Sequence, residues 1–95
     1  MKKKEILKWA ETKGLLKSEN SLKQFLKLSE EVGELANAMI NNNKLETIDA
    51  IGDIVVVLTI LSNQLELDID ECTEVAYNVI KNRTGKMVNG SFIKD

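Results

Sequence analysis

The 95-residue sequence contains no proline, no histidine and a single cysteine, and aromatic residues make up only 4% of it. Because no proline-rich or low-complexity tract marks a linker, we expect residues 1–95 to form one domain. The lone Cys72 cannot form an internal disulfide bond, which is typical of a protein in a reducing compartment such as the cytoplasm. The lack of histidine and cysteine leaves carboxylates as the available metal ligands.

Charge and hydropathy exclude two classes of partner. Thirteen basic and fifteen acidic residues give a formal charge of -2, so no strong field would attract a nucleic-acid polymer or an anionic membrane. The longest apolar run, Ile54 to Leu61, is far shorter than the roughly 20 residues of a membrane span. The basic first residues are not followed by the apolar segment of a signal peptide. We therefore expect a cytoplasmic protein with a small-molecule ligand.

Apolar residues recur three and four positions apart in four segments, as in amphipathic helices. Gly14 and the asparagines at 41–43 are typical residues at which a helix ends. A polar residue followed three positions later by Gln or Glu is a capping signal, and it precedes three of the segments. These pairs are Ser21 with Gln24, Asn43 with Glu46, and Asp68 with Glu71. The pattern predicts helices over about residues 3–13, 21–40, 44–65 and 69–85.

The third segment allows two interpretations, since the β-branched residues from Ile54 to Val57 also suit a buried strand. We favour a helix because the apolar character outlasts a typical strand, no turn residues bound it, and a capping signal precedes it. In the tail, Asn89-Gly90 between short apolar pairs is typical of a tight hairpin. We predict an all-α, four-helix bundle-like domain with a short C-terminal hairpin. Association between copies would enlarge its small core.

Acidic residues gather on the second and third helices. Glu30, Glu31 and Glu34 share one flank of a helix, which by itself is typical of a solvated face. The third helix is apolar nearly all round, which predicts burial on most of its faces, yet it carries Asp49 and Asp53 on one side. Because a buried carboxylate without a partner is costly, we expect a cation at these aspartates.

The short connection at residues 41–43 predicts that the second and third helices form an antiparallel pair. Glu34 precedes this turn by about as many residues as Asp53 follows it, so the two stand at similar heights. The carboxylates of both helices can therefore converge. Such an all-oxygen cluster is typical of a hard cation, Mg²⁺ or Mn²⁺.

Cations follow near the end of the fourth helix, where Lys81, Arg83 and Lys86 come after Asn78. They can simply complement the dipole of the helix. Alongside an acidic metal site, they can also neutralise a phosphate chain, while Asn78 bonds a sugar or phosphate. The combination is typical of nucleotide polyphosphate binding.

These motifs resemble those of the MazG-like all-α nucleoside triphosphate pyrophosphohydrolases, especially the short proteins of phages and Gram-positive bacteria. The EExxE motif of that superfamily is matched by Glu30, Glu31 and Glu34. Its ExxD motif is matched at Asp53, but Ala50 stands at the glutamate position, and Asp49 is the nearest acid. The similarity extends through the N-x-x-K-x-R stretch and covers roughly residues 20–93.

The resemblance implies Mg²⁺-dependent hydrolysis of a (deoxy)nucleoside triphosphate to the monophosphate and pyrophosphate, in house-cleaning of the nucleotide pool. It implies that Glu30 positions or deprotonates the attacking water and that Lys81 and Arg83 steady the phosphates. The metal ligands that it implies are Glu31, Glu34, Asp53 and, as a substitute, Asp49. It also implies a homodimer or homotetramer.

Three further interpretations stay open at this level. Trp9 can stack on a base or pack within the core or an interface. The chain can be a non-catalytic helical dimerisation module whose acids are surface charge, although this does not explain Asp49 and Asp53 within an apolar helix. It can also bind nucleotides with little turnover, as the alanine at position 50 suggests.

Overall fold

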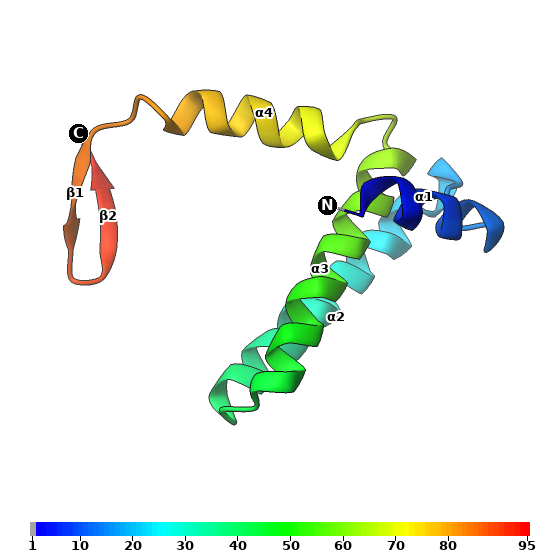
Figure 1. Ribbon diagram of the computed structural model, residues 1–95, viewed down its shortest axis with the longest axis horizontal. Helices are drawn as coiled ribbons and strands as arrows, with labels where there is room; N and C mark the ends of the chain where they lie inside the picture. Colours follow the sequence, from blue (N-terminus) through cyan, green and yellow to red (C-terminus); the bar gives the residue numbers. More distant parts are fainter. Residues whose placement is uncertain (1) are drawn as a thin grey trace.

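The computed structural model describes residues 2–95, which form helices followed by one hairpin (Figure 1). In chain order the elements are α1 (Lys3–Thr12), a 3-10 turn η1 (Ser18–Asn20), α2 (Ser21–Ile40), α3 (Lys44–Gln64), α4 (Ile69–Ile80), β1 (Gly85–Val88) and β2 (Ser91–Lys94). The predicted helical class and the C-terminal hairpin are confirmed, and the contested segment around Ile54 is helical. The fourth helix is shorter than predicted, since it ends at Ile80.

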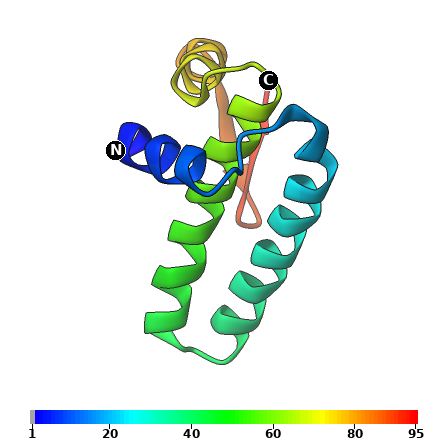
Figure 2. The same ribbon diagram turned by 90° about the vertical axis from the view of Figure 1, so that its right-hand side faces the viewer.

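The helices α2 and α3 form the antiparallel pair that the short connection predicted, and α1 packs across the C-terminal half of α3 (Figure 2). Two small residues, Ala38 and Ala50, are buried where α2 and α3 meet. They allow the two backbones to approach closely. Further along α3, Val57 and Ile60 are buried, and Ala10 is buried on α1. This narrow seam is the core of the described chain.

Local hydrogen bonds explain the helix ends. The side-chain oxygen of Asn43 accepts a bond from the Glu46 backbone N–H at 3.0 Å, so this predicted cap is confirmed. Gly14, with φ +72°, ends α1, and the N–H of Leu15 returns to the Ala10 carbonyl at 2.9 Å. The predicted cap at Ser21 is wrong, because α2 continues directly from η1 and Ser21 is already in helical conformation.

The predicted cap at Asp68 also makes no side-chain bond to the helix that follows. Its carboxylate instead accepts a hydrogen bond from the Lys3 ammonium at 3.0 Å, and Lys3 also lies 2.8 Å from the carboxylate of Asp70. This pairing with Lys3 lowers the pKa of Asp68. The first helix is thereby joined to the start of α4.

The apolar side chains of α2 are largely exposed. Leu22 is 79% exposed, and Phe25, Leu26, Met39 and Ile40 are also at the surface. Glu31, in contrast, is buried on this helix. An amphipathic helix is expected to bury apolar side chains and to expose charged ones.

The expected burial of α3 on most faces is also wrong within one chain. Ile48, Ile51 and Leu58 are exposed, while a single face packs on α2 and α1. The α3 helix packs mainly on α2 and α1, with smaller contacts to η1 and α4, so part of its apolar surface stays exposed among the described residues.

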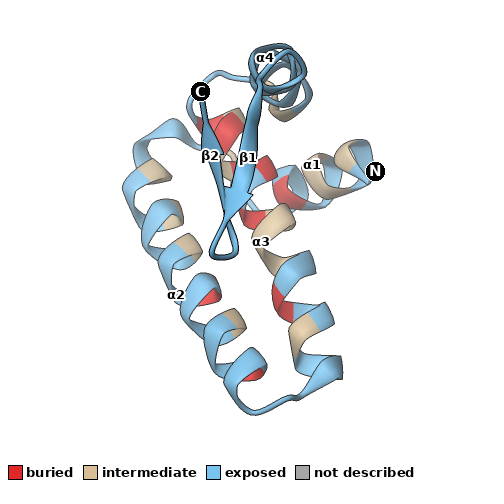
Figure 3. Ribbon diagram, turned by 90° about the vertical axis from the view of Figure 1, so that its left-hand side faces the viewer, coloured by how far each residue is buried: buried red, intermediate tan, exposed pale blue. Residues whose placement is uncertain are grey.

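The bundle-like arrangement is not completed, because α4 extends away from the other helices (Figures 1 and 3). Every residue from 70 to 80 is exposed, including the apolar Val75 and Val79. Glu66, with φ +62°, ends α3, and the N–H of Leu67 returns to the Ser62 carbonyl at 2.8 Å. This C-terminal turn directs the chain away from the α2–α3 pair.

The hairpin has the predicted two-residue turn. Asn89 and Gly90 have φ of 49° and 84°, as a type I′ turn requires, and Val88 pairs with Ser91. Both strands are fully exposed. Within residues 2–95, no helix combines the length and the apolar content needed to cross a bilayer.

Asn43→Ala is expected to lower the free energy of unfolding by about 1 kcal/mol, because it removes the acceptor for the Glu46 N–H. Ser21→Ala is the matched control and should change stability much less, since Ser21 caps nothing. Urea unfolding followed by circular dichroism measures both. Equal losses in the two variants would contradict the assigned cap.

Candidate functional site

A buried glutamate lies at the centre of the candidate site. Glu31 is only 4% exposed, although it belongs to a helix whose apolar residues are mostly at the surface. One of its carboxylate oxygens lies 3.2 Å from the Lys27 ammonium, and the other, Oε2, has no hydrogen-bond partner. A buried charged group with an unsatisfied oxygen costs free energy, which an apolar side chain would avoid. This position therefore indicates that Glu31 is suited to bind a cation or to accept a hydrogen bond from a ligand.

Three further carboxylates lie near Glu31. The pKa of Glu34 is raised, first because its protonated carboxyl can donate a hydrogen bond to the Glu31 carboxylate and then by the charge of Glu31. Burial raises the pKa of Asp53, and the negative charges of Asp49 and Glu31 raise it further. Acids of the two helices therefore lie near enough to affect one another's ionisation, Glu31 and Glu34 on α2 and Asp49 and Asp53 on α3.

Glu30 stands apart from this cluster. Its side chain is exposed, and its carboxylate lies 3.7 Å from the Lys27 ammonium. Lys27 thus lies between the two adjacent glutamates, and its pKa is raised mainly by the hydrogen bond to Glu31. The lysine partly neutralises an otherwise all-negative group.

The donor set suits Mg²⁺ in chemistry. It consists of carboxylate oxygens, one of which is buried and unpartnered. Among residues 2–95, no three His, Cys, Asp or Glu side chains already surround a single point closely enough to hold an ion. Side-chain rotation at Glu34 and Asp49, which are both exposed, would have to complete the coordination.

A pocket of about 700 Å³ lies between α1, α2 and α3, and the acidic cluster borders one end of it. Along α3 its wall runs from Asp53 to Gln64, and along α2 it runs from Glu31 back to Lys23. Trp9 of α1 contributes to the wall, and it also lies beside Val56 in a neighbouring hollow. The pocket is concave, partly apolar and charged at one end, as expected of a site for a phosphorylated small molecule.

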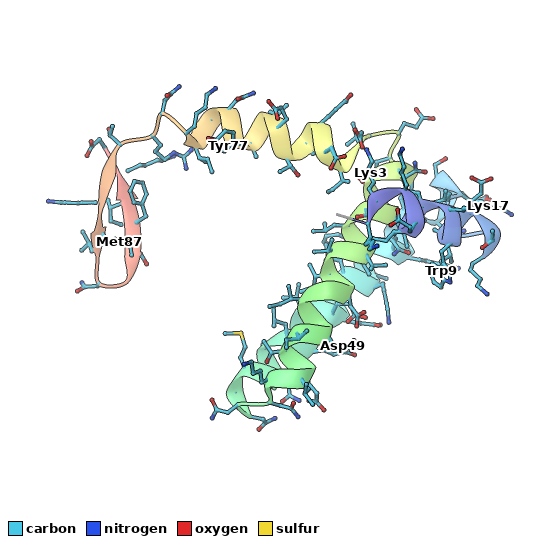
Figure 4. The ribbon with its side chains drawn as sticks, viewed as in Figure 1. Lys3, Trp9, Lys17, Asp49, Tyr77 and Met87 are labelled. Atoms are coloured by element: carbon cyan, nitrogen blue, oxygen red, sulfur yellow. The ribbon has the colours of Figure 1, made fainter. Side chains whose placement is uncertain are left out.

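The cations predicted to bind phosphate do not join this site within one chain. Asn78 lies on α4, Lys81 and Arg83 follow the end of that helix, and Lys86 lies on β1. Figure 4 shows α4, marked by Tyr77, extending away from the helix pair that carries Asp49. One chain therefore separates its acidic residues from its predicted phosphate-binding residues.

Comparison with known families decides the assignment. The sequence profile of the phosphoribosyl-ATP pyrophosphohydrolase family matches residues 8–84, which include α1 to α4 except for the first residues of α1. The chain belongs to this family. The family is part of the MazG-like all-α superfamily, so the resemblance noted in the sequence is confirmed.

A curated relative is 42% identical over 65 residues, the "Uncharacterized 18.2 kDa protein in rep-hol intergenic region" of Haemophilus phage HP1. The alignment covers 68% of this chain and 40% of that relative, so the chain spans well under half of the relative's length. No solved structure matches the chain.

One acid in the sequence was missed. Glu46 and Asp49 themselves have the E-x-x-D spacing, one turn before Ala50 and Asp53. Together with Glu34, they line a second pocket of about 290 Å³ that also reaches Ala50. The alanine thus leaves open space beside three carboxylates, and the E-x-x-D spacing could have identified Glu46.

Two other residues were also missed. Lys27 precedes Glu31 by four positions on one helix, a spacing that predicts the observed ion pair. Gln64, which follows the apolar run of the third helix, is 2% exposed and lines the larger pocket. A polar residue of this kind becomes recognisable only when the third helix is packed against its neighbours.

The raised pKa values set the expected pH dependence. Glu34 and Asp53 retain protons to higher pH when folded than in the unfolded chain, where their pKa values are near 4.5 and 3.8. Their contribution to stability therefore decreases as pH rises from these values through the folded-state ones. A divalent cation bound by the ionised carboxylates would oppose this loss.

We therefore expect Mg²⁺ to raise the unfolding temperature at pH 7 and to have less effect at pH 5. Asp53→Asn should raise the unfolding temperature without metal by a few degrees, because it removes a repelled charge, and should reduce the response to Mg²⁺. Glu74→Gln on the exposed α4 is the control and should behave as the parent chain. A destabilised Asp53→Asn variant with an intact Mg²⁺ response would contradict this account.

Proposed function

We propose that this chain hydrolyses a nucleoside or deoxynucleoside triphosphate to the monophosphate and pyrophosphate. The observation that carries the proposal is the buried Glu31 with its unpartnered oxygen, placed among other acids at the end of a pocket. Membership of a pyrophosphohydrolase family supports the same reaction class. The substrate is a polyphosphate in this proposal because its charge requires both a cation-binding end and basic side chains.

The proposed cofactor is Mg²⁺, with Mn²⁺ as a substitute. Glu31, Glu34, Asp49 and Asp53 would hold it, and Glu46 would serve in place of the glutamate that position 50 lacks. When bound, the metal supplies positive charge that offsets the charge of the phosphate oxygens.

Glu30 is the proposed base. Its exposed carboxylate would accept a proton from water as the water oxygen bonds to the α-phosphorus. The bond between the α-phosphorus and the α–β bridging oxygen breaks, and the electron pair leaves with pyrophosphate. Lys27, which pairs with Glu30 and Glu31, would be released from Glu31 when a metal takes its place, and its ammonium would then face a phosphate.

The remaining phosphate contacts are proposed to come from a second copy of the chain. Asn78, Lys81 and Arg83 lie far from the carboxylates of their own chain, while α4 and the hairpin expose apolar residues throughout. Exposed apolar surfaces on α2 and α3 are the available complement. A homodimer or homotetramer would bury these surfaces and deliver the cations to a neighbouring acidic cluster.

Two observations also suit the alternative functions, a dimerisation module and a nucleotide-binding protein with little turnover. The exposed apolar faces would equally serve a non-catalytic dimerisation module. The alanine at position 50 would suit a relative that binds nucleotides with little turnover. Product formation separates both from the proposed enzyme.

Purified chain with Mg²⁺ is expected to release pyrophosphate, without orthophosphate, from at least one member of a panel of canonical dNTPs, oxidised dNTPs and phosphoribosyl-ATP. Glu34→Gln should lower the rate by more than 100-fold, since loss of a metal-ligating carboxylate removes charge neutralisation. Glu74→Gln is the control. Chromatography of the nucleotide products measures the outcome. No product, together with no Mg²⁺-dependent nucleotide binding in calorimetry, would favour the dimerisation module.

Mixing two inactive variants tests the contribution of a second copy. Glu34→Gln and Arg83→Ala are each expected to be inactive alone, and their mixture should recover activity. Recovery occurs because some sites combine an intact acidic cluster from one chain with an intact Arg83 from another. A mixture of Glu34→Gln with Asp53→Asn is the control and should stay inactive, since both lesions lie in the same cluster. Equal inactivity of both mixtures would show that one chain supplies the whole site.

A further inference from the structure

The pocket changes in chemical character along its length. Glu31 and Asp53 lie at one end, and α2 and α3 run antiparallel, so Lys27 and then Lys23 follow toward the other end. From Asp53 to Gln64 the α3 wall spans about 16 Å at 1.5 Å per residue, a length comparable to that of an extended nucleotide. From the Asp53 end to the Gln64 end, the pocket lining is therefore first acidic, then basic and then largely neutral.

Gln64, at the neutral end, carries a second unsatisfied polar atom. Its Nε2 donates a hydrogen bond to the Leu15 carbonyl at 2.7 Å, while its Oε1 is buried and has no partner. Because a carbonyl can only accept, this bond determines which end of the amide is the oxygen. An unsatisfied buried acceptor is costly, and a donor from a bound molecule would remove that cost.

Trp9 lines the same pocket and is 51% exposed, so its indole offers a surface on which a planar ring can stack (Figure 4). Leu15 and Ile60 add apolar wall near Gln64. Stacking does not distinguish one base from another, because every base has an aromatic face. Any discrimination at this end therefore depends on the polar atoms that meet the edge of the base.

We propose that the Gln64 end of the pocket binds a nucleobase that carries an exocyclic amino group, with Trp9 as the stacking surface and Gln64 Oε1 as the acceptor. This inference rests on the proposed function. Adenine and cytosine present an amino donor at the edge of the ring, where uracil and thymine present a carbonyl oxygen. The N3–H of uracil or thymine lies between two carbonyls, which would repel Oε1. The site would therefore favour amino over keto bases.

Ligand pairs that exchange the amino group for a carbonyl, and thereby place a proton on the adjacent ring nitrogen, provide the first test. The α,β-methylene analogues of dCTP and dUTP, and of dATP and dITP, differ at the amino position and are not cleaved to pyrophosphate. Trp9 is the single tryptophan of the chain, so quenching of its fluorescence reports directly on occupancy near it. We expect the amino member of each pair to bind about fivefold to tenfold more tightly, as one hydrogen bond allows.

Gln64→Met is expected to reduce this preference to near unity by weakening the amino analogues alone. Asn63→Leu, one position earlier and outside the pocket lining, is the matched control and should retain the preference. Circular dichroism checks the fold of both variants. If Gln64→Met does not fold, the paired analogues with the parent chain still decide the inference.

The outcomes distinguish this inference from the proposed function. Pyrophosphate release with equal affinity for amino and keto analogues would overturn the base assignment while leaving the hydrolysis intact. A preference that persists in Gln64→Met would also overturn it. Amino-selective quenching without hydrolysis would support the base site and remove the proposed catalysis.

Discussion

The ion pair between Lys27 and the buried Glu31 carboxylate places negative charge on the inner face of α2, where an apolar side chain would pack without that cost. Asp53 of α3 lies beside this face, and its pKa is raised by burial and then by the charges of Asp49 and Glu31. Small residues such as Ala38 and Ala50 then allow the helices to approach despite the repulsion. The helix pair is organised around charge, and its apolar contacts are confined to a narrow seam.

Apolar side chains of α2 and α3 are exposed, while the Glu31 carboxylate occupies a buried position between the helices. Leu22 and Ile40 on α2 and Ile51 on α3 are exposed in the single chain, as is almost every residue after position 69. A 95-residue domain buries only a small core, so each apolar side chain that stays exposed removes a substantial part of its stabilisation. The arrangement that gathers the acids therefore also leaves exposed the apolar surfaces by which copies would associate in the proposed oligomer. In that proposal, the chemistry of the site and the assembly both depend on α2.

Sequence reasoning succeeded where the determining interactions are local. The Asn43 cap, the Gly14 helix end and the Asn89-Gly90 turn depend on residues within a few positions of each other, and each was predicted. The pairing of α2 with α3 followed from a short connection. The faces of the helices were not predictable, because periodicity assumes that apolar residues turn inward and Glu31 breaks that assumption. The Lys27–Glu31 pair could have been predicted from its i, i+4 spacing, whereas Gln64 became recognisable only through contacts between helices.

The length of the α4 helix determines where the basic residues that follow it lie. It has twelve residues and is supported at its start by Lys3, which pairs with Asp68 and Asp70. It therefore acts as a spacer of about 18 Å between the helix pair and the basic residues after Ile80. Inserting a single residue would move those residues by about 1.5 Å and rotate them by about 100°. Length changes in α4 would therefore redirect the basic residues, even though the side chains of α4 make few contacts within their own chain.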